Sequence, residues 1–277
     1  MRPNAVDEAL AALAAGPYCV LAGGTDFYPA RVGRLIDEPV LDITALEALR
    51  GIREEAEGWR IGALATWSEL LATPLPPLFD GLKLAGREVG GVQIQNMGTI
   101  AGNLCNASPA ADGIPNLLCL DAEVELRSAT GARSLPVAEF VLGNRSTACR
   151  PDELVTAIIV PRHGERARSA FLKLGARRYL VISIVMVAAV LQCDEAGTVS
   201  SARVSVGSCS ARALRLPVLE QELVGKALTP DLADLVNDRH LDELTPIDDV
   251  RGGAAYRREA AAVLLRRALR QLAEGGT

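Results

Sequence analysis

Residues 97–112 of this 277-residue chain read Met-Gly-Thr-Ile-Ala-Gly-Asn-Leu-Cys-Asn-Ala-Ser-Pro-Ala-Ala-Asp. They belong to a longer segment, residues 90–115, that mixes glycine, asparagine and proline with apolar side chains that an exposed surface loop would not need. This composition predicts buried backbone that wraps around another group. Thr99 and Asn103 add polar donors beside Gly102, where a charged ligand could approach the backbone closely.

A second glycine-rich stretch lies near the N-terminus. Tyr18–Ala22 is predicted as a short buried strand that ends at Gly23-Gly24, and Thr25-Asp26 is a potential N-cap for a helical turn that extends to Val32. Paired glycines at the end of a strand expose backbone N–H groups that suit a phosphate, although a plain strand-to-helix turn would look the same.

Together the two glycine-plus-threonine loops predict a clamp for the diphosphate of an extended dinucleotide. Hydrogen bonds to a charged group are worth roughly 1.5–3 kcal/mol each, so four or five of them would need no cationic side chain. Asp112 either accepts from a ribose hydroxyl or forms an Asx turn before Pro115.

Composition excludes several classes of protein. With 49% hydrophobic and 23% charged residues the chain is not disordered, and its net charge of −5 and 4% aromatic content argue against nucleic-acid binding. The longest apolar run, residues 180–191, is shorter than the roughly 20 residues that cross a bilayer, and the N-terminus lacks a signal-peptide pattern. We expect a cytoplasmic protein without membrane contact.

The few potential metal ligands form no metal-binding pattern. Neighbouring cysteines are at least fourteen residues apart, as between Cys105 and Cys119, and neither His163 nor His240 lies near a cysteine. We expect six buried, reduced thiols, two solvated histidines and no metal site. A Gly-x-Gly-x-x-Gly motif and a complete P-loop are also missing, so a Rossmann or P-loop nucleotide site has no support.

The order of predicted elements indicates an α+β protein of two domains. A polar segment at residues 161–165 separates residues 1–165 from residues 166–277. In the first part we expect helices at residues 4–15, 66–71 and 116–120 and strands at 39–43, 59–61, 122–127 and 154–160. In the second we expect strands at residues 169–174, 181–192 and 199–207, followed by helices at 214–224, 230–235 and 251–272.

Lys173 is one of only three lysines and lies within a predicted strand. Two interpretations remain open for it. It is either an outward-facing strand lysine or a fixed cation beside a cofactor that becomes anionic on reduction.

The two glycine segments, with other short motifs in matching order, resemble the FAD-binding subunit of molybdenum hydroxylases of the xanthine dehydrogenase and carbon monoxide dehydrogenase type. The resemblance covers nearly the whole chain, through residues 22–26, 61–63, 97–112, 151–155, 171–173, 182–185 and 256–258.

The resemblance implies an FAD-binding domain of two α+β lobes, followed by a smaller domain with a three-stranded antiparallel sheet and helices. It further implies a large molybdopterin-binding partner and a small partner with [2Fe–2S] clusters, from which electrons pass through FAD to NAD⁺ or another acceptor. The family's acidic residue near the flavin is replaced here by Leu180 or Val181, which counts against NAD⁺.

The resemblance assigns FAD contacts but no catalytic side chain, because the flavin itself transfers the electrons. The implied cofactor-binding residues are Val20, Leu21, Ala22, Gly23, Gly24, Thr25, Asp26, Phe27, Val89, Thr99, Ile100, Ala101, Gly102, Asn103, Asn106, Asp112, Val155 and Lys173. The alternatives are a stand-alone flavoprotein oxidoreductase of the same superfamily and a scaffold without cofactor.

Overall fold

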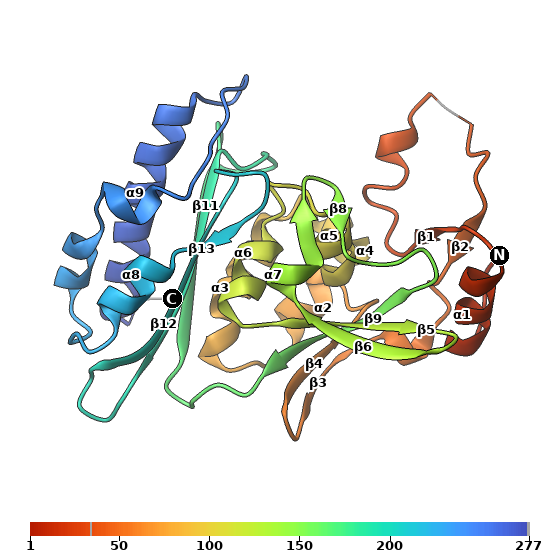
Figure 1. The fold of residues 1–277 in the computed structure, drawn as a ribbon, viewed down its shortest axis with the longest axis horizontal. Coiled ribbons are helices and arrows are strands. Elements are labelled where there is room, and N and C mark those ends of the chain that lie inside the picture. Colours follow the sequence, from red (N-terminus) through yellow and green to blue (C-terminus); the bar gives the residue numbers. More distant parts are fainter. Residues whose placement is uncertain (34, 276–277) are drawn as a thin grey trace.

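The computed structural model describes residues 1–33 and 35–275. The chain begins with helix α1 (Val6–Ala15), which buries Leu10 and Leu13 on one face. Strand β1 (Cys19–Leu21) follows and pairs in parallel with β2 (Val40–Asp42) at one end of the molecule (Figure 1). We predicted β1 as a buried strand, but it is partly exposed because this sheet has only two strands. The expected helical turn after Thr25 is a 3₁₀ helix, η1 (Pro29–Arg31).

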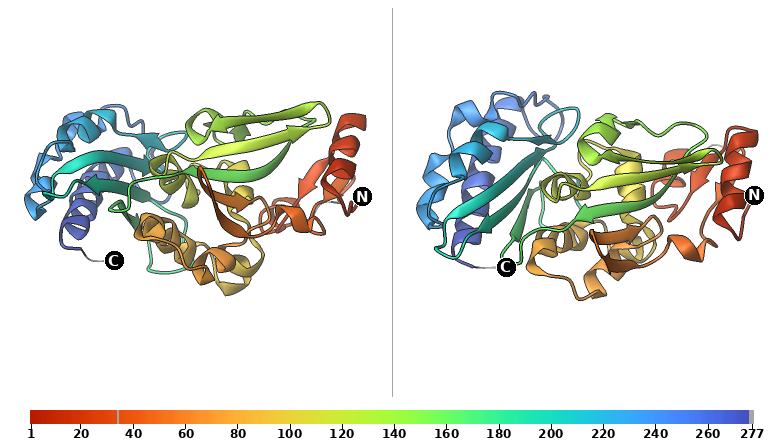
Figure 2. Two further views of the ribbon diagram at one scale, coloured as in Figure 1. Left: turned by 90° about the horizontal axis from the view of Figure 1, so that it is seen from below. Right: turned by 60° about the horizontal axis from the view of Figure 1, so that its bottom comes forward.

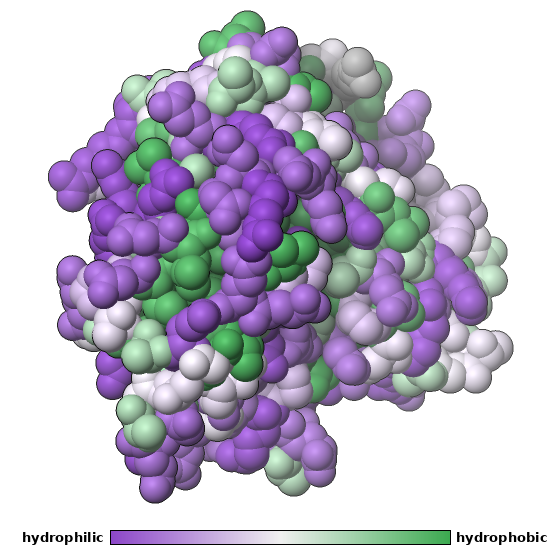
Figure 3. Space-filling view, turned by 60° about the vertical axis from the view of Figure 1, so that its left-hand side comes forward, coloured by the Kyte–Doolittle hydropathy of each residue, from purple (hydrophilic) through white to green (hydrophobic). Residues whose placement is uncertain are grey.

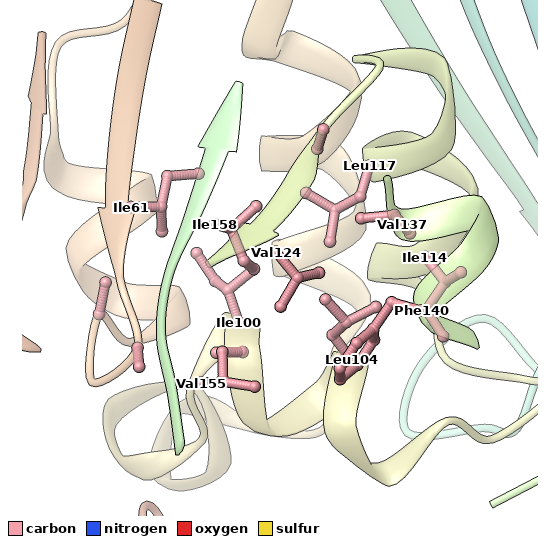
Figure 4. Close-up of a cluster of buried hydrophobic side chains, with 14 of the residues drawn as sticks. Ile61, Ile100, Leu104, Ile114, Leu117, Val124, Val137, Phe140, Val155 and Ile158 are labelled. Carbon is pink, nitrogen blue, oxygen red and sulfur yellow. The ribbon is translucent and has the colours of Figure 1, made fainter. Parts of the chain in front are cut away.

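A five-stranded antiparallel sheet forms the centre of the first half. Its strand order is β3-β4-β9-β5-β6, with β3 (Ile52–Glu55), β4 (Gly58–Gly62), β5 (Glu123–Ser128), β6 (Gly131–Pro136) and β9 (Leu154–Pro161). Figure 4 shows Val124 and Ile158 of this sheet packed near Ile100 and Leu104. All four side chains are fully buried, so this contact is part of the main hydrophobic core.

Residues 90–115, which we expected to contain a binding loop, are largely helical. They hold α4 (Val92–Met97) and α5 (Ile100–Asn106) and lead into α6 (Gly113–Cys119). The other helices on this side are α2 (Trp67–Ala72) and α3 (Asp80–Glu88), and α2 begins with the capping box that Thr66 and Glu69 predict.

The second half is a four-stranded antiparallel sheet with helices on both faces. It comprises β10 (Arg168–Leu174), β11 (Val185–Cys193), β12 (Val199–Gly207) and the short edge strand β13 (Leu214–Arg215). Helices α8 (Pro217–Leu223) and α9 (Ala254–Ala273) cover one face, and α3 and α6 contact the other (Figures 1 and 2). Burial from both sides explains why β11 is apolar throughout most of its length.

The architecture confirms the predicted α+β class, and the second sheet adds β13 to the three strands that we expected. Residues 181–184, which we included in a strand, precede β11 as irregular backbone. The outer face of the second half is mostly hydrophilic, with apolar side chains gathered near its middle (Figure 3). In the part of the chain that the structure describes, no helix has the length and apolar character needed to cross a membrane.

His240 and several cysteines lie in other environments than we predicted. The side chain of His240 is buried, and both of its ring nitrogens have partners there: Nδ1 accepts a hydrogen bond from the Asn237 amide at 3.1 Å, and Nε2 contacts Glu222. Among the thiols, Cys119 and Cys209 are buried, whereas Cys105 is exposed. The sequence around these residues therefore did not predict how exposed their side chains are.

Candidate functional site

A cavity of about 610 Å³ lies between the segment after β1, helix α5 and the hairpin formed by β7 (Val141–Gly143) and β8 (Ser146–Thr147). Most of the predicted cofactor-binding residues meet in its wall. The lining includes Val20, Ala22, Gly23, Gly24, Thr25, Asp26, Phe27, Val89, Thr99, Ala101, Gly102, Asn103, Asn106 and Val155. The structure thus brings together two stretches that are about seventy residues apart in sequence.

Four predicted residues do not line this cavity. Leu21 pairs with Asp42 in the two-stranded sheet, and Ile100 is fully buried in the hydrophobic core. Asp112 and Lys173 bind each other behind the cavity wall.

The two glycine-containing segments touch each other directly. A Cβ atom at Gly23 would lie 1.9 Å from the Met97 carbonyl oxygen, so no other residue fits there without moving the backbone. Gly24 has a φ of +72°, which favours glycine. Among the described residues, none accepts a hydrogen bond from the backbone N–H of Gly23, Gly24 or Thr25. These amides are therefore available to an anionic ligand.

Thr99 lies at the start of helix α5, whose first residues form the second wall of the cavity. Its Oγ1 accepts a hydrogen bond from the Gly102 amide at 2.9 Å, so Thr99 is an N-cap rather than part of a loop. A Cβ at Gly102 would lie 2.7 Å from this oxygen. Asn103 faces the cavity one turn later, and its Oδ1 accepts from the Gly113 amide of α6 at 3.3 Å.

Two arginines in the cavity wall were absent from our prediction, which placed no cationic side chain near the diphosphate. Arg31 lies over the Phe27 ring, 3.9 Å from its centroid, and forms an ion pair with Glu38. Arg145, at the tip of the β7–β8 hairpin, donates to Asn106 Oδ1 at 2.8 Å. No local motif marks Arg145, because only the folded hairpin brings it to the end of α5.

Behind the cavity, three polar side chains form a buried cluster. Lys173 Nζ lies 2.6 Å from Asp112 Oδ2, each side chain is 7% exposed, and Ser183 donates to Asp112 Oδ1 at 2.5 Å. Burial raises the pKa of the Asp112 carboxyl, although Lys173 and Ser183 oppose this effect. Lys173 is thus an inward-facing lysine whose charge Asp112 balances.

Glu153 lines the cavity but is already fully engaged. Arg133 donates to both of its oxygens, at 2.6 and 2.8 Å, and the Arg150 amide donates at 2.8 Å. The hydrogen bonds from Arg133 lower the pKa of Glu153. Next to it, burial raises the pKa of Cys149 to about 11, so this thiol stays neutral at physiological pH.

The site combines unpaired backbone donors, hydroxyl groups and apolar side chains in the wall of one cavity. Backbone N–H groups at glycines bind phosphate oxygens closely. We call the part of the wall formed by Gly23, Gly24, Thr25, Thr99 and Gly102 the cradle. Its unpaired amides at residues 23–25 suit a diphosphate. The residues present therefore fit a dinucleotide such as FAD. In residues 1–33 and 35–275, no group of three histidine, cysteine, aspartate or glutamate side chains is arranged to hold a metal ion.

Fold and site define a flavoprotein subunit of the molybdenum hydroxylase type. Residues 1–163 match the family model of the FAD-binding domain in molybdopterin dehydrogenase, and residues 170–272 match that of the CO dehydrogenase flavoprotein C-terminal domain. The chain belongs to this family of FAD-binding medium subunits, which confirms the resemblance seen in the sequence.

Individual relatives are similar over most of both chains. The nicotinate dehydrogenase FAD-subunit of Eubacterium barkeri is 32% identical and aligns over 88% of this chain and 84% of its own. The carbon monoxide dehydrogenase medium chain of Afipia carboxidovorans is also 32% identical, with 97% and 94% coverage. A solved structure of reconstituted CO dehydrogenase from Oligotropha carboxidovorans superimposes with a TM-score of 0.90 at 30% identity, with 99% and 96% coverage.

Proposed function

We propose that this chain carries electrons within a heteromeric molybdopterin-dependent hydroxylase or dehydrogenase. Electrons enter from the [2Fe–2S] clusters of a small partner subunit, pass through FAD on this chain and leave to NAD⁺ or another acceptor. The observation that carries the proposal is the cavity that Gly23–Thr25, whose backbone amides have no hydrogen-bond acceptor among the described residues, line together with Thr99 and Gly102. When bound, FAD supplies the redox chemistry, and the protein supplies position and electrostatics.

We assign the predicted residues to this cofactor according to their place in the cavity. Gly23, Gly24 and Thr25 donate to the diphosphate from one side, and Thr99 and Gly102 contribute from the other. Val89 and Val155 supply apolar wall. Asp112 and Lys173 act from behind this wall as positioning residues.

Partners, domain division and location follow the same proposal. The catalytic molybdopterin site belongs to a large partner subunit, in line with relatives that are themselves a medium chain and an FAD-subunit of their dehydrogenases. We divide the chain into an FAD-binding domain, residues 1–165, and a C-terminal domain, residues 166–277. Six free thiols support a reducing compartment such as the cytoplasm.

Flavin binding tests the proposal directly. The full-length chain should bind FAD with the absorbance bands of a flavoprotein, and FAD at 100 times its Kd should stabilise the fold by about 2.7 kcal/mol in thermal unfolding. Riboflavin, which lacks the diphosphate, is the matched control and should stabilise far less. Failure of FAD to bind or to raise the melting temperature would contradict the assignment.

Co-purification tests the assembly separately from the cofactor. Tagged chain isolated from its native cell should bring down a molybdenum-containing polypeptide and an iron–sulfur polypeptide in equal amounts. Steady turnover of NADH or substrate by the isolated flavoprotein would instead favour the stand-alone oxidoreductase.

A further inference from the structure

Three side chains gather where the cavity meets strand β1. Arg31 lies over the ring of Phe27, 3.9 Å from its centroid, and its Nη2 donates to Cys19 Sγ at 3.3 Å. All three residues line the cavity, and we call them the Arg31 cluster. Because Cys19 pairs with Val40 in the two-stranded sheet, the cluster lies at the end of the molecule that is far from the C-terminal sheet (Figure 1).

The contacts of Arg31 fix its guanidinium and balance its charge. Its Nη1 donates to the Phe27 carbonyl at 2.9 Å, and Glu38 forms an ion pair with the same guanidinium. One of the two N–H groups on Nη1 therefore has no acceptor among the described residues. Phe27 covers one face of the guanidinium, but the Arg31 side chain is still 23% exposed. An arginine whose charge is already balanced suits a neutral planar ring that accepts hydrogen bonds better than it suits a phosphate.

The cavity extends from the Arg31 cluster to Val89, beside the C-terminal half of the molecule. Val89 follows Glu88, whose carbonyl accepts a hydrogen bond from Lys173 Nζ of strand β10 at 3.5 Å. The family resemblance places the flavin ring beside residues 180–181, in this same half. A dinucleotide that the cradle holds by its diphosphate then extends its adenosine in the other direction, toward β1 and the Arg31 cluster.

The spacing along the chain and the chemistry of the cluster both suit an adenosine. Phe27 is two residues beyond Thr25 of the cradle, which is at most about 7 Å of backbone, a gap that a ribose between phosphate and base can fill. Adenine has ring nitrogens that accept hydrogen bonds, and its π face attracts a guanidinium by the cation–π interaction. Arg31 offers a donor and a planar cationic face.

We propose that Arg31, oriented by Glu38 and Phe27, contacts the adenine ring of the dinucleotide and makes this site select FAD over FMN. The proposal rests on the FAD-binding function above and names the residue that distinguishes between the two flavin cofactors. The sequence did not mark Arg31, because only the fold brings it over Phe27 and beside Cys19.

The test compares the affinities of the full-length chain for FAD and for FMN, which lacks the adenylate half. Fluorescence titration measures both Kd values for the wild type and for each variant. Arg31→Met removes the guanidinium but keeps an unbranched side chain, and it should raise the Kd of FAD about tenfold. The Kd of FMN should stay within twofold of the wild-type value, because FMN does not reach the Arg31 cluster.

Arg31→Lys separates the planar group from the charge. The lysine can still pair with Glu38, but it lacks the flat guanidinium that stacks on a ring. It should therefore lose most of the FAD affinity that Arg31→Met loses and bind FMN as the wild type does. If Arg31→Met does not fold, as urea unfolding without cofactor would show, this variant carries the test.

Two further variants complete the design. Glu38→Gln removes the charge that orients Arg31, and it should weaken FAD binding by a smaller factor without affecting FMN. Arg53→Met changes an exposed arginine that pairs with Glu55 on β3, outside the cavity. It is the matched control and should leave both Kd values unchanged.

Each outcome decides the proposal. A selective loss of FAD affinity in Arg31→Met and Arg31→Lys supports it. An equal loss for FAD and FMN overturns it, because Arg31 would then act on the flavin half or on the shape of the cradle. Unchanged FAD affinity overturns it as well, and so does a wild-type chain that binds FMN as tightly as FAD. If the wild-type chain binds no FAD, the proposed function fails instead, which is a separate result.

Discussion

Removal of the Lys173 ammonium should destabilise the whole molecule, because it leaves the Asp112 carboxylate buried without its cation. The Nζ–Oδ2 distance is 2.6 Å and both side chains are 7% exposed, so water cannot replace the lost partner. Breaking a buried ion pair by removing one member costs about 3–5 kcal/mol. For Lys173→Met we expect a loss of this size in urea unfolding and a fall of about 10 °C in melting temperature.

The double variant Asp112→Asn with Lys173→Met distinguishes the stability lost by leaving a buried charge unpaired from the stability lost through changed side-chain packing. The amide introduced at position 112 retains an oxygen for the Ser183 hydroxyl, which donates to Asp112 Oδ1 at 2.5 Å in the wild type. Since no charge is then left buried, the double variant should recover at least half of the loss. Far-UV circular dichroism and the fluorescence of Trp59 and Trp67 should report coincident transitions.

The stability loss caused by Lys173→Met should depend on pH, and the pKa of Asp112 gives the direction of this dependence. Burial raises the pKa of Asp112 in the folded state, and without Lys173 this effect is unopposed by the nearest cation. A carboxyl whose folded pKa is raised binds its proton more tightly in the folded state, so stability increases as pH falls through that pKa. The cost of Lys173→Met should therefore shrink toward acidic pH. A loss below about 1 kcal/mol at pH 7, or no recovery in the double variant, would refute the reasoning.

Three other substitutions test the cradle, its neighbouring ion pair and a helix cap. Gly23→Ala forces a Cβ against the Met97 carbonyl and should weaken FAD binding at least tenfold, about 1.4 kcal/mol, in a fluorescence titration, whereas Gly16→Ala, with open space around its Cβ, should bind as the wild type does. Glu153→Gln should lower stability at pH 7 by about 2 kcal/mol. Because the fold lowers the pKa of Glu153, the greater stability of the wild type is present above the unfolded pKa and is lost as pH falls through the folded pKa. Equal denaturation midpoints of wild type and variant at pH 7 would contradict this prediction. Thr66→Ala removes the capping box of α2 and should cost about 1 kcal/mol in the same assay, while Thr130→Ala, in an exposed turn, should cost almost nothing.

Elements with a local signal were predictable from sequence. The capping-box spacing of Thr66 and Glu69 placed the start of α2 correctly, and the apolar run at residues 154–160 became the central strand β9. The long helix α9 follows from its repeating buried face. In these cases the signal lies within one element, so no distant contact is needed to interpret it.

Residues 90–115 show where this reasoning fails. Helices α4 and α5 have six and seven residues, too few for a helical period to stand out; Gly98 lies between them and Gly102 lies within α5. Their ends are fixed from elsewhere, as by the bond from the Ile100 amide to the Ala65 carbonyl at 3.1 Å. The cavity residues were identified because glycine and threonine mark a close approach whether the backbone is a loop or a helix start. Arg145 carries no such mark.

Helix α6 connects the cavity to the C-terminal sheet, so a substitution of Lys173 can affect the cavity through this helix. All seven of its residues are buried, the Asn103 side chain binds the Gly113 amide at its start, and Asp112 precedes that amide. Asp121, just beyond α6, pairs with Arg203 and Arg215 of the sheet. A change at Lys173 can therefore reach the cavity by moving α6 and Asn103, without any direct electrostatic effect on the flavin. In that case Lys173→Met should weaken FAD binding as it lowers stability, and the Asp112→Asn, Lys173→Met double variant should recover both while the flavin potential equals that of the wild type. A flavin potential of the double variant that differs from the wild type, at recovered stability, would show that the Lys173 charge itself acts on the flavin.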